Sequence, residues 1–333
     1  MNSFDYTNST LFGWSKEERW AGTIWGIFVL VSSLIGDSTI LVASIKYKAF
    51  QLHKTVVTFI QHLAVCDLIV AVSYALPVVS SLIANRWPLN GPLVCYCAAY
   101  LGSYGYSASG LLICGMTLSK LLLLKYPLKA RSWSGRKSHQ VCAVIWLASL
   151  LIPICFLAVD NDDIYFDYRM YNCNYGFKSD VWKILLPISC TLAGFIPNLT
   201  IVVSTVLVLK EARAVAMRTE EGLRWQGVLT VVLTAAIYTI SILPFASYYI
   251  LEPLVLAGED LTMPNPYLEY YYRIACAFMN LNVITNFFVY CLTVSSFRKF
   301  ISSRFQLALS SLYYVILRTG KRLIYVKSSL LAT

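Results

Sequence analysis

Apolar residues in this chain are gathered into long blocks, and the polar residues are collected in short segments between them. Seven blocks can be drawn, at about residues 21–46, 55–83, 92–125, 140–160, 181–210, 223–252 and 268–292. Each block is about 20 residues or longer, the length at which an apolar helix crosses the hydrocarbon core of a bilayer. The pattern predicts an all-α membrane protein built as a bundle of seven transmembrane helices.

The composition agrees with this fold class. Hydrophobic residues make up 58% of the chain and charged residues only 13%, whereas soluble domains carry roughly 25% charged residues. The first block is too long for a cleavable signal peptide, and residues 2–20 before it lack a basic start, so we expect no processed targeting segment. The expected divisions are an extracellular tail at 1–20, a membrane domain at 21–306 and a cytoplasmic tail at 307–333.

The positions of the basic residues predict the orientation. If the N-terminus is outside, the inner loops and tail hold 19 Lys and Arg residues and the outer segments hold 5. Acidic residues divide the other way, with 12 outside and 3 inside. Because cytoplasmic loops are enriched in Lys and Arg, we expect the N-terminus outside. The net charge of +10 is thus a topology signal, and nothing in it indicates nucleic-acid binding.

Several polar residues lie inside the apolar blocks. Asp37 and Asp67 lie in the first and second blocks, and Asn280, Asn282 and Asn286 lie in the seventh. An ionisable group in hydrocarbon is costly unless it faces the bundle interior, so each acid is a functional-site hypothesis. For Asp67, a cation site or proton relay and a network that joins helices by hydrogen bonds remain equal alternatives. For Asp37 the network is favoured.

Landmark residues follow one another along nearly the whole chain in a recognisable order. They are Gly36-Asp37, His62-Leu63-Ala64 with Asp67, Ser119-Lys120-Leu121, Pro127-Leu128, Trp146, Pro197, Pro244 and Asn286-Phe287-Phe288-Val289-Tyr290. As a set they resemble the motifs of the rhodopsin-like G-protein-coupled receptors. In that family the corresponding motifs are Gly-Asn, Asn-Leu-Ala-x-x-Asp, Asp-Arg-Tyr, Pro-Leu, a central Trp in helix four, the kinking prolines of helices five and six, and Asn-Pro-x-x-Tyr.

The resemblance implies site residues. Cys95 and Cys173, both in outer segments, look like the disulfide that ties helix three to the second outer loop. The segment from Ser295 to Phe300 resembles the short amphipathic helix on the inner membrane surface. The remaining residues implied are the sodium pocket of Asp67, Ser109, Asn282 and Asn286, and the G-protein-facing switch of Ser119, Lys120 and Tyr290.

The chain also departs from the family pattern. Lys120 stands where the family has Arg, and Ser119 stands where it has an acid. Arg224 lies near the position of a partner acid and would repel Lys120. Further departures are Ser241-Ile242-Leu243-Pro244 without the toggle Trp, Thr205 in place of a switch Tyr, and a seventh helix without its Pro. These changes bear on activation and coupling, whereas the fold rests on the apolar blocks.

Two residues that bind known ligand classes in this family are missing, which argues against an amine or retinal ligand for this chain. Gly102 stands where biogenic-amine receptors have Asp, and the seventh block has no Lys of the kind that holds retinal in opsins. The ligand-pocket candidates are Gly102, Tyr106, Phe245 and Tyr249, below an acidic, tyrosine-rich loop at 160–175. Acids concentrate cationic ligands and aromatic walls suit basic side chains, which favours a basic peptide. Alternatively, the tyrosines belong to the membrane interface, and the outer loops are acidic because basic residues are kept inside.

The favoured function is a plasma-membrane receptor that passes a signal from an extracellular ligand to a heterotrimeric G protein, with arrestin and the lipid bilayer as further partners. The alternatives are a receptor-fold protein with weak or no coupling and a multipass transporter, although transporters usually show repeated halves. No nucleophile elbow, phosphate loop or metal cluster indicates an enzyme, and no cofactor is expected apart from an allosteric sodium ion. Asn8, in Asn8-Ser9-Thr10, is the glycosylation candidate.

Overall fold

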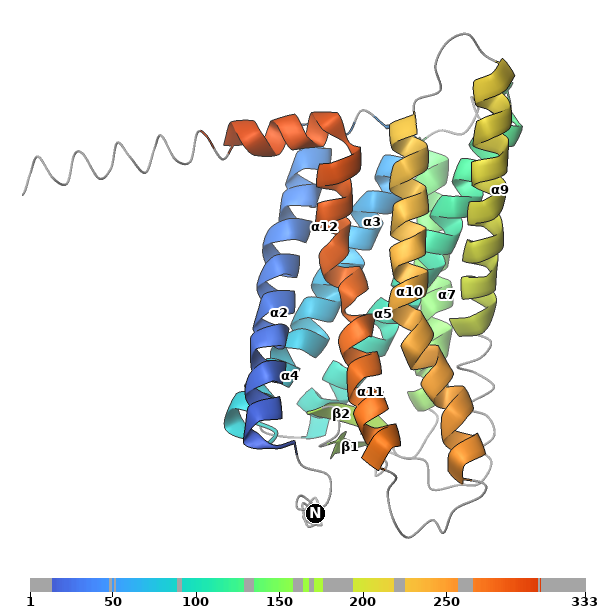
Figure 1. Ribbon diagram of the computed structural model, residues 1–333. Coiled ribbons are helices and arrows are strands. Elements are labelled where there is room, and N and C mark those ends of the chain that lie inside the picture. Colours follow the sequence, from blue (N-terminus) through green and yellow to red (C-terminus); the bar gives the residue numbers. More distant parts are fainter. Residues whose placement is uncertain are drawn as a thin grey trace, which may run out of the picture.

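The helices of the computed structural model stand side by side as one bundle (Figure 1). It describes residues 14–47, 50, 52–88, 92–128, 135–157, 164–167, 171–175, 194–218, 225–256, 266–304 and 306. In chain order the bundle contains α2 (Lys16–Ile45), α3 (Lys54–Val70), the π-helical turn η1 (Ala71–Ala75), α4 (Leu76–Ala84), α5 (Pro92–Lys125), α7 (Gly135–Leu157), α9 (Ile196–Arg218), α10 (Trp225–Leu256), α11 (Pro266–Met279) and α12 (Leu281–Thr293). The predicted bundle is confirmed, with α3, η1 and α4 as its second span and α11 with α12 as its seventh.

Length and composition identify membrane spans within the described residues. Five helical segments are long and apolar enough to cross a bilayer, namely Lys16–Ile45, Lys54–Ala84, Leu93–Lys125, Trp225–Tyr248 and Tyr267–Thr293. The described part of α9 begins after the first half of the predicted block at 181–210. We call the end of the bundle with the first residues of α2 the outer end, and the end where α3 and α7 begin the inner end.

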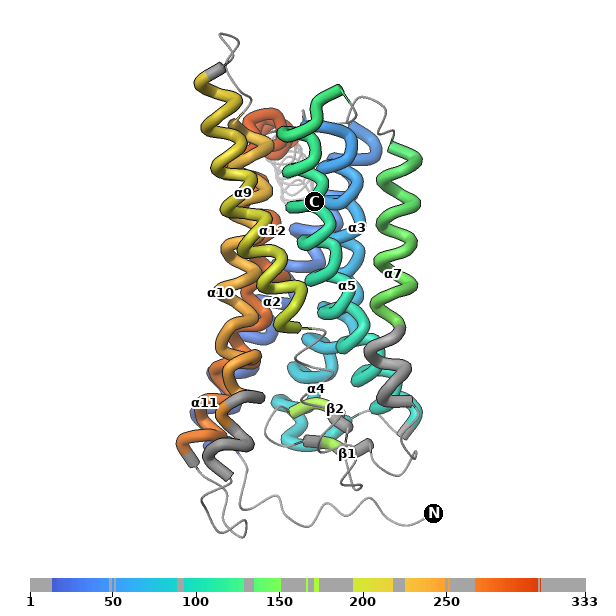
Figure 2. The backbone as a smooth tube through the Cα atoms, turned by 90° about the vertical axis from the view of Figure 1, so that its right-hand side faces the viewer, coloured from blue at the N-terminus to red at the C-terminus, as the bar shows by residue number. Residues whose placement is uncertain are grey.

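The helix α5 lies in the middle of the bundle, where it packs against α3, α7, α9 and α10 (Figure 2). Glycines mark its closest approaches. A Cβ atom on Gly105 would lie 2.6 Å from the Val70 side chain of α3, and one on Gly110 would lie 2.2 Å from the Tyr238 hydroxyl of α10. Side chains at these positions would push the neighbouring helices apart, so the central place of α5 depends on its small residues.

The first helix starts earlier than the apolar block indicates. Ser15 accepts a hydrogen bond from the Glu18 backbone N–H (3.2 Å), and the Glu18 carboxylate accepts one from the Ser15 N–H (2.7 Å). This reciprocal capping box satisfies two amide groups that would otherwise lack partners at a helix start. The helix therefore begins at Lys16, within the segment expected to be a tail.

The second and seventh spans are both interrupted. In the second, the π-helical turn η1 precedes Pro77 of α4, and α4 is followed by Asn85 in a left-handed conformation (φ 53°). In the seventh, the helix breaks at Asn280, between α11 and α12. Residues 295–304 are helical again and turn away from α12 at the inner end of the bundle (Figure 1).

A short hairpin lies at the outer end. Its strands β1 (Ile164–Asp167) and β2 (Asn172–Tyr175) are antiparallel, and Phe166 is paired with Cys173. The hairpin belongs to the loop between α7 and α9, and both of its strands lie close to α5. It places part of the acidic, tyrosine-rich loop over the outer end of the helices.

Candidate functional site

A polar site is buried between α3, α5 and α12. The Asn286 side-chain amide of α12 donates a hydrogen bond of 2.6 Å to Asp67 Oδ2 of α3, and the Asn282 amide donates one of 3.0 Å to the Ser109 hydroxyl of α5. All four side chains are buried. Asn282 and Asn286 are four residues apart and share one face of α12, so they reach α5 and α3 from the same side. The structure thus brings together the four residues predicted for the sodium pocket.

A second acid lies next to this site. The Ser33 hydroxyl is 2.7 Å from Asp37 Oδ2 and 3.3 Å from the Asp67 backbone oxygen, so one hydroxyl bridges the first and second spans. Ser33 and Asp37 are both fully buried on α2. Sequence reasoning found Asp37 but missed Ser33, because one serine in an apolar helix carries no motif. A spacing of four residues from Asp37 was the one available signal.

Three acceptor oxygens in this region lack a hydrogen-bond partner among the described residues. They are Asp37 Oδ1, Asp67 Oδ1 and Asn282 Oδ1. A buried carboxylate without a counter-charge is strongly unfavourable, so the site must take up protons or a cation. Oxygens of carboxylate, amide and hydroxyl groups are the ligands preferred by hard cations. The arrangement therefore suits either a sodium ion or a protonated network.

Polar contacts continue from this site toward the outer end. The Tyr106 hydroxyl of α5 donates to Asn280 Oδ1 (2.8 Å), and the Tyr106 ring meets the Tyr74 ring edge to face at 5.7 Å. A Cβ atom on Gly102 would lie 3.7 Å from Tyr74. Tyr106 and Gly102 thus face the second span. Of these two ligand-pocket candidates, Tyr106 also reaches the seventh span.

The other ligand-pocket candidates lie on α10. The Phe245 ring stacks on Tyr272 of α11 with centroids 6.3 Å apart, and Tyr248 meets the same ring at 4.4 Å. Tyr249 belongs to α10, but its side chain lies outside the described residues. The outer parts of the sixth and seventh spans therefore form an aromatic wall. This wall does not contact Tyr106 through any ring pair found among the described residues.

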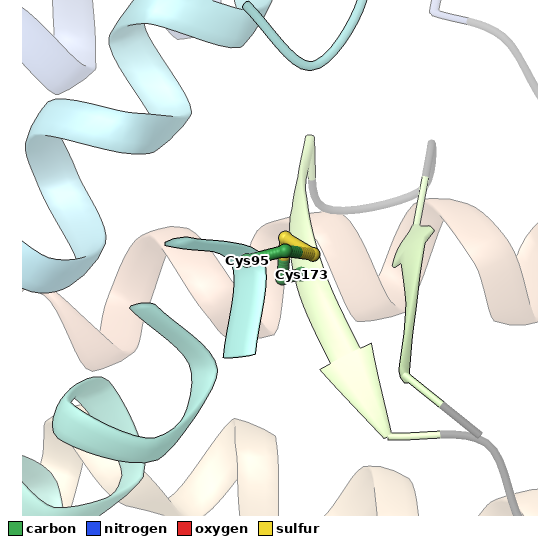
Figure 3. The surroundings of a disulfide bond; sticks show 2 residues. All are labelled: Cys95 and Cys173. Carbon is green, nitrogen blue, oxygen red and sulfur yellow. A yellow bond between two sulfur atoms is a disulfide. The ribbon is translucent and has the colours of Figure 1, made fainter. Parts of the chain in front are cut away.

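The predicted disulfide between Cys95 and Cys173 is present (Figure 3). It joins the first turn of α5 to β2. Next to it, the Tyr171 hydroxyl donates to Asn85 Oδ1 (2.8 Å), and the Tyr171 ring lies 5.7 Å from the Trp14 ring. The hairpin is thereby attached to the second and third spans and to the segment before α2.

One basic residue joins the beginning of α2 to the seventh span. The Arg273 guanidinium of α11 lies 3.3 Å from the Glu18 carboxylate and 5.3 Å from the centre of the Trp14 ring. A Cβ atom on Gly22 would collide with the same Trp14 ring at 2.3 Å. Trp14 is therefore held between α2, α11 and the hairpin. Motif reasoning gave no role to Trp14 or Arg273.

The predicted switch residues lie near the inner end. The Lys120 ammonium lies 3.3 Å from the position that a Cβ on Gly227 of α10 would occupy, and no ion pair of Lys120 occurs among the described residues. Ser119 is buried. The pKa of His53, just before α3, is lowered by burial and further by the charge of Lys120. Lys120 therefore makes the surroundings of His53 more positive.

Tyr290, the third switch residue, is buried at 1% exposure, and its ring meets Phe50 edge to face at 5.7 Å. Two neighbouring contacts, neither part of a family motif, join α10 to the end of α12 and to the helical segment that follows it. They are the Thr230–Thr293 hydroxyl pair at 2.8 Å and the bond from the Gln226 amide to the Ser295 hydroxyl at 3.0 Å. Threonine and glutamine are common in helices, so sequence reasoning had no signal for these contacts. Asn8, Arg224 and the tail at 307–333 lie outside the described residues.

Comparison with known proteins identifies relatives. Residues 37–290 match the family described as 7 transmembrane receptor (rhodopsin family). Lysophosphatidic acid receptor 4 of Homo sapiens is 23% identical over 303 residues, which are 88% of this chain and 79% of that receptor. Melatonin receptor type 1A of Mus musculus is 25% identical over 280 residues (82% and 76%). The cholecystokinin receptor of Xenopus laevis is 26% identical over 202 residues (58% and 43%).

Proposed function

Because this chain belongs to the rhodopsin family of seven-transmembrane receptors, we propose that it is a plasma-membrane receptor that activates a heterotrimeric G protein when an extracellular ligand binds. The observation that carries this proposal is the row of interhelical hydrogen bonds along the seventh span. Asn280, Asn282 and Asn286 bind Tyr106, Ser109 and Asp67 in turn. A ligand that moves Tyr106 at one end of this row changes the packing of every helix that the row joins.

The proposed ligand is a basic peptide that enters from the outer end. Support comes from the aromatic wall of Phe245, Tyr248 and Tyr272, whose rings suit cationic and apolar side chains. It also comes from the acids of the outer loops, which raise the local concentration of cations. Among the similar proteins, one is named for the peptide cholecystokinin and others for lysophosphatidic acid and melatonin. The ligand screen therefore needs a lipid arm and an indoleamine arm beside the peptide arm.

The screen uses cells that display the full chain, with several second messengers recorded at once. We expect a response in the peptide arm, and a larger one from peptides rich in Lys or Arg. Replacing Tyr106 with Phe keeps the ring and removes only the hydroxyl bond to Asn280, so the response to the active ligand should shift to higher concentrations. A response confined to the lipid or indoleamine arm would replace the peptide proposal and leave the receptor proposal intact.

Coupling depends on Lys120 in this proposal. Lysine keeps the positive charge of the family's arginine but loses the planar fork of five donors, so its contacts with a G protein are weaker. No acid restrains Lys120 in the described residues, because Ser119 precedes it and Gly227 faces it. The proposed resting state therefore has no ionic clamp at this position.

The alternative function, a receptor-fold protein with little or no G-protein coupling, is favoured by the same Lys120. The decisive comparison is between the wild type, Lys120→Ala, and the double variant Ser119→Asp with Lys120→Arg, at matched surface expression. A signalling receptor should lose its response in Lys120→Ala. The double variant should give a larger ligand-driven response and a lower basal one. Three indistinguishable responses would support the alternative, with Lys120 only reaching toward the membrane surface.

A further inference from the structure

Three hydrogen-bonding rings join α3 to α7. The Trp146 indole nitrogen Nε1 donates to His62 Nδ1 over 3.0 Å, and His62 Nε2 lies 3.1 Å from His139 Nδ1. The centroids of the two imidazole rings are 5.4 Å apart. His62 is half-buried and His139 is exposed on the outside of the bundle. The three rings lie in the inner half, because α3 starts at Lys54 and α7 at Gly135.

The tryptophan fixes where the hydrogens of this group lie. An indole N–H can only donate, so His62 Nδ1 must be an unprotonated acceptor. A neutral imidazole carries its one hydrogen on the other nitrogen. His62 Nε2 therefore donates to His139 Nδ1, and the hydrogen of neutral His139 is on its Nε2 atom. Both bonds are formed in this one arrangement, in which both histidines are neutral.

An added proton cannot be accommodated without breaking a bond. On His62 Nδ1 it would face the Trp146 N–H, and on His139 Nδ1 it would face the His62 N–H. Sharing a proton between the rings would require the His62 hydrogen to move to Nδ1, which again meets Trp146. Every protonated form therefore loses at least one of the two bonds between α3 and α7.

We propose that His62 and His139 form a proton-sensitive latch between α3 and α7, closed when both rings are neutral and opened by protonation. The described groups around the two histidines offer no negative charge that would stabilise a protonated ring and keep the latch closed. Apart from the two histidines and the disulfide, the described charged and titratable side chains here are His53 just before α3, Lys54, Cys66 and Asp67 on α3, Arg136, Lys137 and Cys142 on α7, and Tyr96, Cys97, Tyr100, Tyr104, Tyr106, Cys114, Lys120 and Lys125 on α5. Asp67 is the one carboxylate in this set, and it is bound to Asn286 of α12. No acid among the described residues is therefore placed to stabilise an imidazolium here.

A second contact between the same helices provides an internal control. The Ser138 hydroxyl of α7 donates to the Thr55 hydroxyl of α3 over 3.2 Å. Neither group titrates in the histidine range, so this contact contributes equally at every pH in that range. Ser138→Ala should lower the melting temperature by the same amount across the range. His62 variants should instead change how melting depends on pH.

The test measures thermal unfolding of the full chain in lipid nanodiscs between about pH 7.5 and pH 5.5, the range in which histidine titrates. The wild type should lose about 2–4 °C more on acidification than His62→Asn, which keeps an acceptor for Trp146 but cannot titrate. His139→Gln should resemble His62→Asn. His53→Gln replaces the remaining histidine and removes only that residue's own contribution to the acid loss. In the His53→Gln background, His62→Asn should therefore still reduce the loss. Equal losses in the wild type and His62→Asn would overturn the proposal.

A spectroscopic measurement decides the matter if a variant does not fold. Selective isotope labelling of histidine and tryptophan in the wild-type chain reports the tautomer of each imidazole. His62 should be in the Nε2–H form at neutral pH, and the indole signal of Trp146 should shift in the pH range where the histidine pair takes up its proton. The Nδ1–H form of His62, or a Trp146 signal that stays constant through the histidine titration, would exclude the latch.

Discussion

The Asn286 amide donates a hydrogen bond of 2.6 Å to Asp67 Oδ2 and so joins the second and seventh spans in the middle of the bundle. The other carboxylate oxygen, Asp67 Oδ1, has no partner among the described residues, and neither has the nearby Asn282 Oδ1. A buried carboxylate with an unpartnered oxygen must bind either a cation or a proton. These two outcomes respond differently to sodium.

Sodium is expected to stabilise the folded chain through Asp67. At ten times its dissociation constant, the ion should raise the free energy of unfolding by about 1.4 kcal/mol over an equal concentration of choline. Asp67→Asn should remove this difference, whereas Asp37→Asn should retain it because Asp37 binds Ser33 instead. Thermal unfolding in detergent is the measurement. If sodium and choline give equal melting temperatures for the wild type and for Asp67→Asn, a protonated network replaces the ion site.

Loss of the disulfide should destabilise the outer end. Cys95 and Cys173 are 78 residues apart in the sequence. Closing a loop of this size lowers the entropy of the unfolded chain and so stabilises the folded state by up to about 4 kcal/mol. The double variant Cys95→Ala with Cys173→Ala should therefore melt at a lower temperature than the wild type. Cys97→Ala is the matched control, because Cys97 is an exposed free thiol two positions away in α5. Equal effects of the two changes would contradict a structural role for the disulfide.

Gly110→Ala should weaken the packing of α10 on α5. The new methyl group would lie 2.2 Å from the Tyr238 hydroxyl, so the tyrosine ring or the helix must move. Overpacking of this kind costs about 1–3 kcal/mol. Chemical or thermal unfolding measures the loss. Gly135→Ala, where a Cβ meets nothing within 4 Å, should lack this loss, and a stable Gly110→Ala variant would show that Tyr238 has room to turn aside.

The charge of Lys120 should be detectable in the titration of His53. Burial and then the charges of Lys120 and Lys54 lower the His53 pKa below 6.5. As the pH falls below about 6.5, the unfolded chain takes up this proton first, so acidification favours unfolding. Lys120→Met should raise the His53 pKa and reduce the loss of stability. Nuclear magnetic resonance can follow His53, with His53→Gln to assign its signal; a pKa unchanged by Lys120→Met would place the two side chains too far apart to interact.

The spans could be predicted from the sequence because apolar runs are the physical requirement for crossing a bilayer. Helix ends could not, because other interactions set them. The capping box of Ser15 and Glu18 starts α2 before its apolar run. At the other end of the bundle, α9 continues to Arg218, since charged residues are good helix formers once the chain has left the apolar block. The predicted blocks therefore locate the helices but not their ends.

Site residues could be predicted where one helix carries a recognisable pattern. They could not be predicted where their role depends on contact with a residue of another helix. Asp67, Asn282 and Asn286 were found as polar residues inside apolar blocks, and the family resemblance grouped them with Ser109. His139 was not, because it lies 77 residues from His62 in the sequence and no pattern links the two. The imidazole of His62 was noted only as a substitute for Asn. Its partners became apparent once α3 and α7 were placed side by side.

The seventh span breaks at Asn280, seven residues before Phe287, which stands where the family has its kinking proline. Asn280 keeps its own backbone N–H, and its side-chain nitrogen donates to the Cys276 carbonyl oxygen over 2.8 Å, in competition with the helical bond. The opposite end of the same amide is held by the Tyr106 hydroxyl. The Asn280 amide therefore joins the break in the seventh span to Tyr106 of α5, so the break and a ligand-pocket candidate share one hydrogen-bonding group.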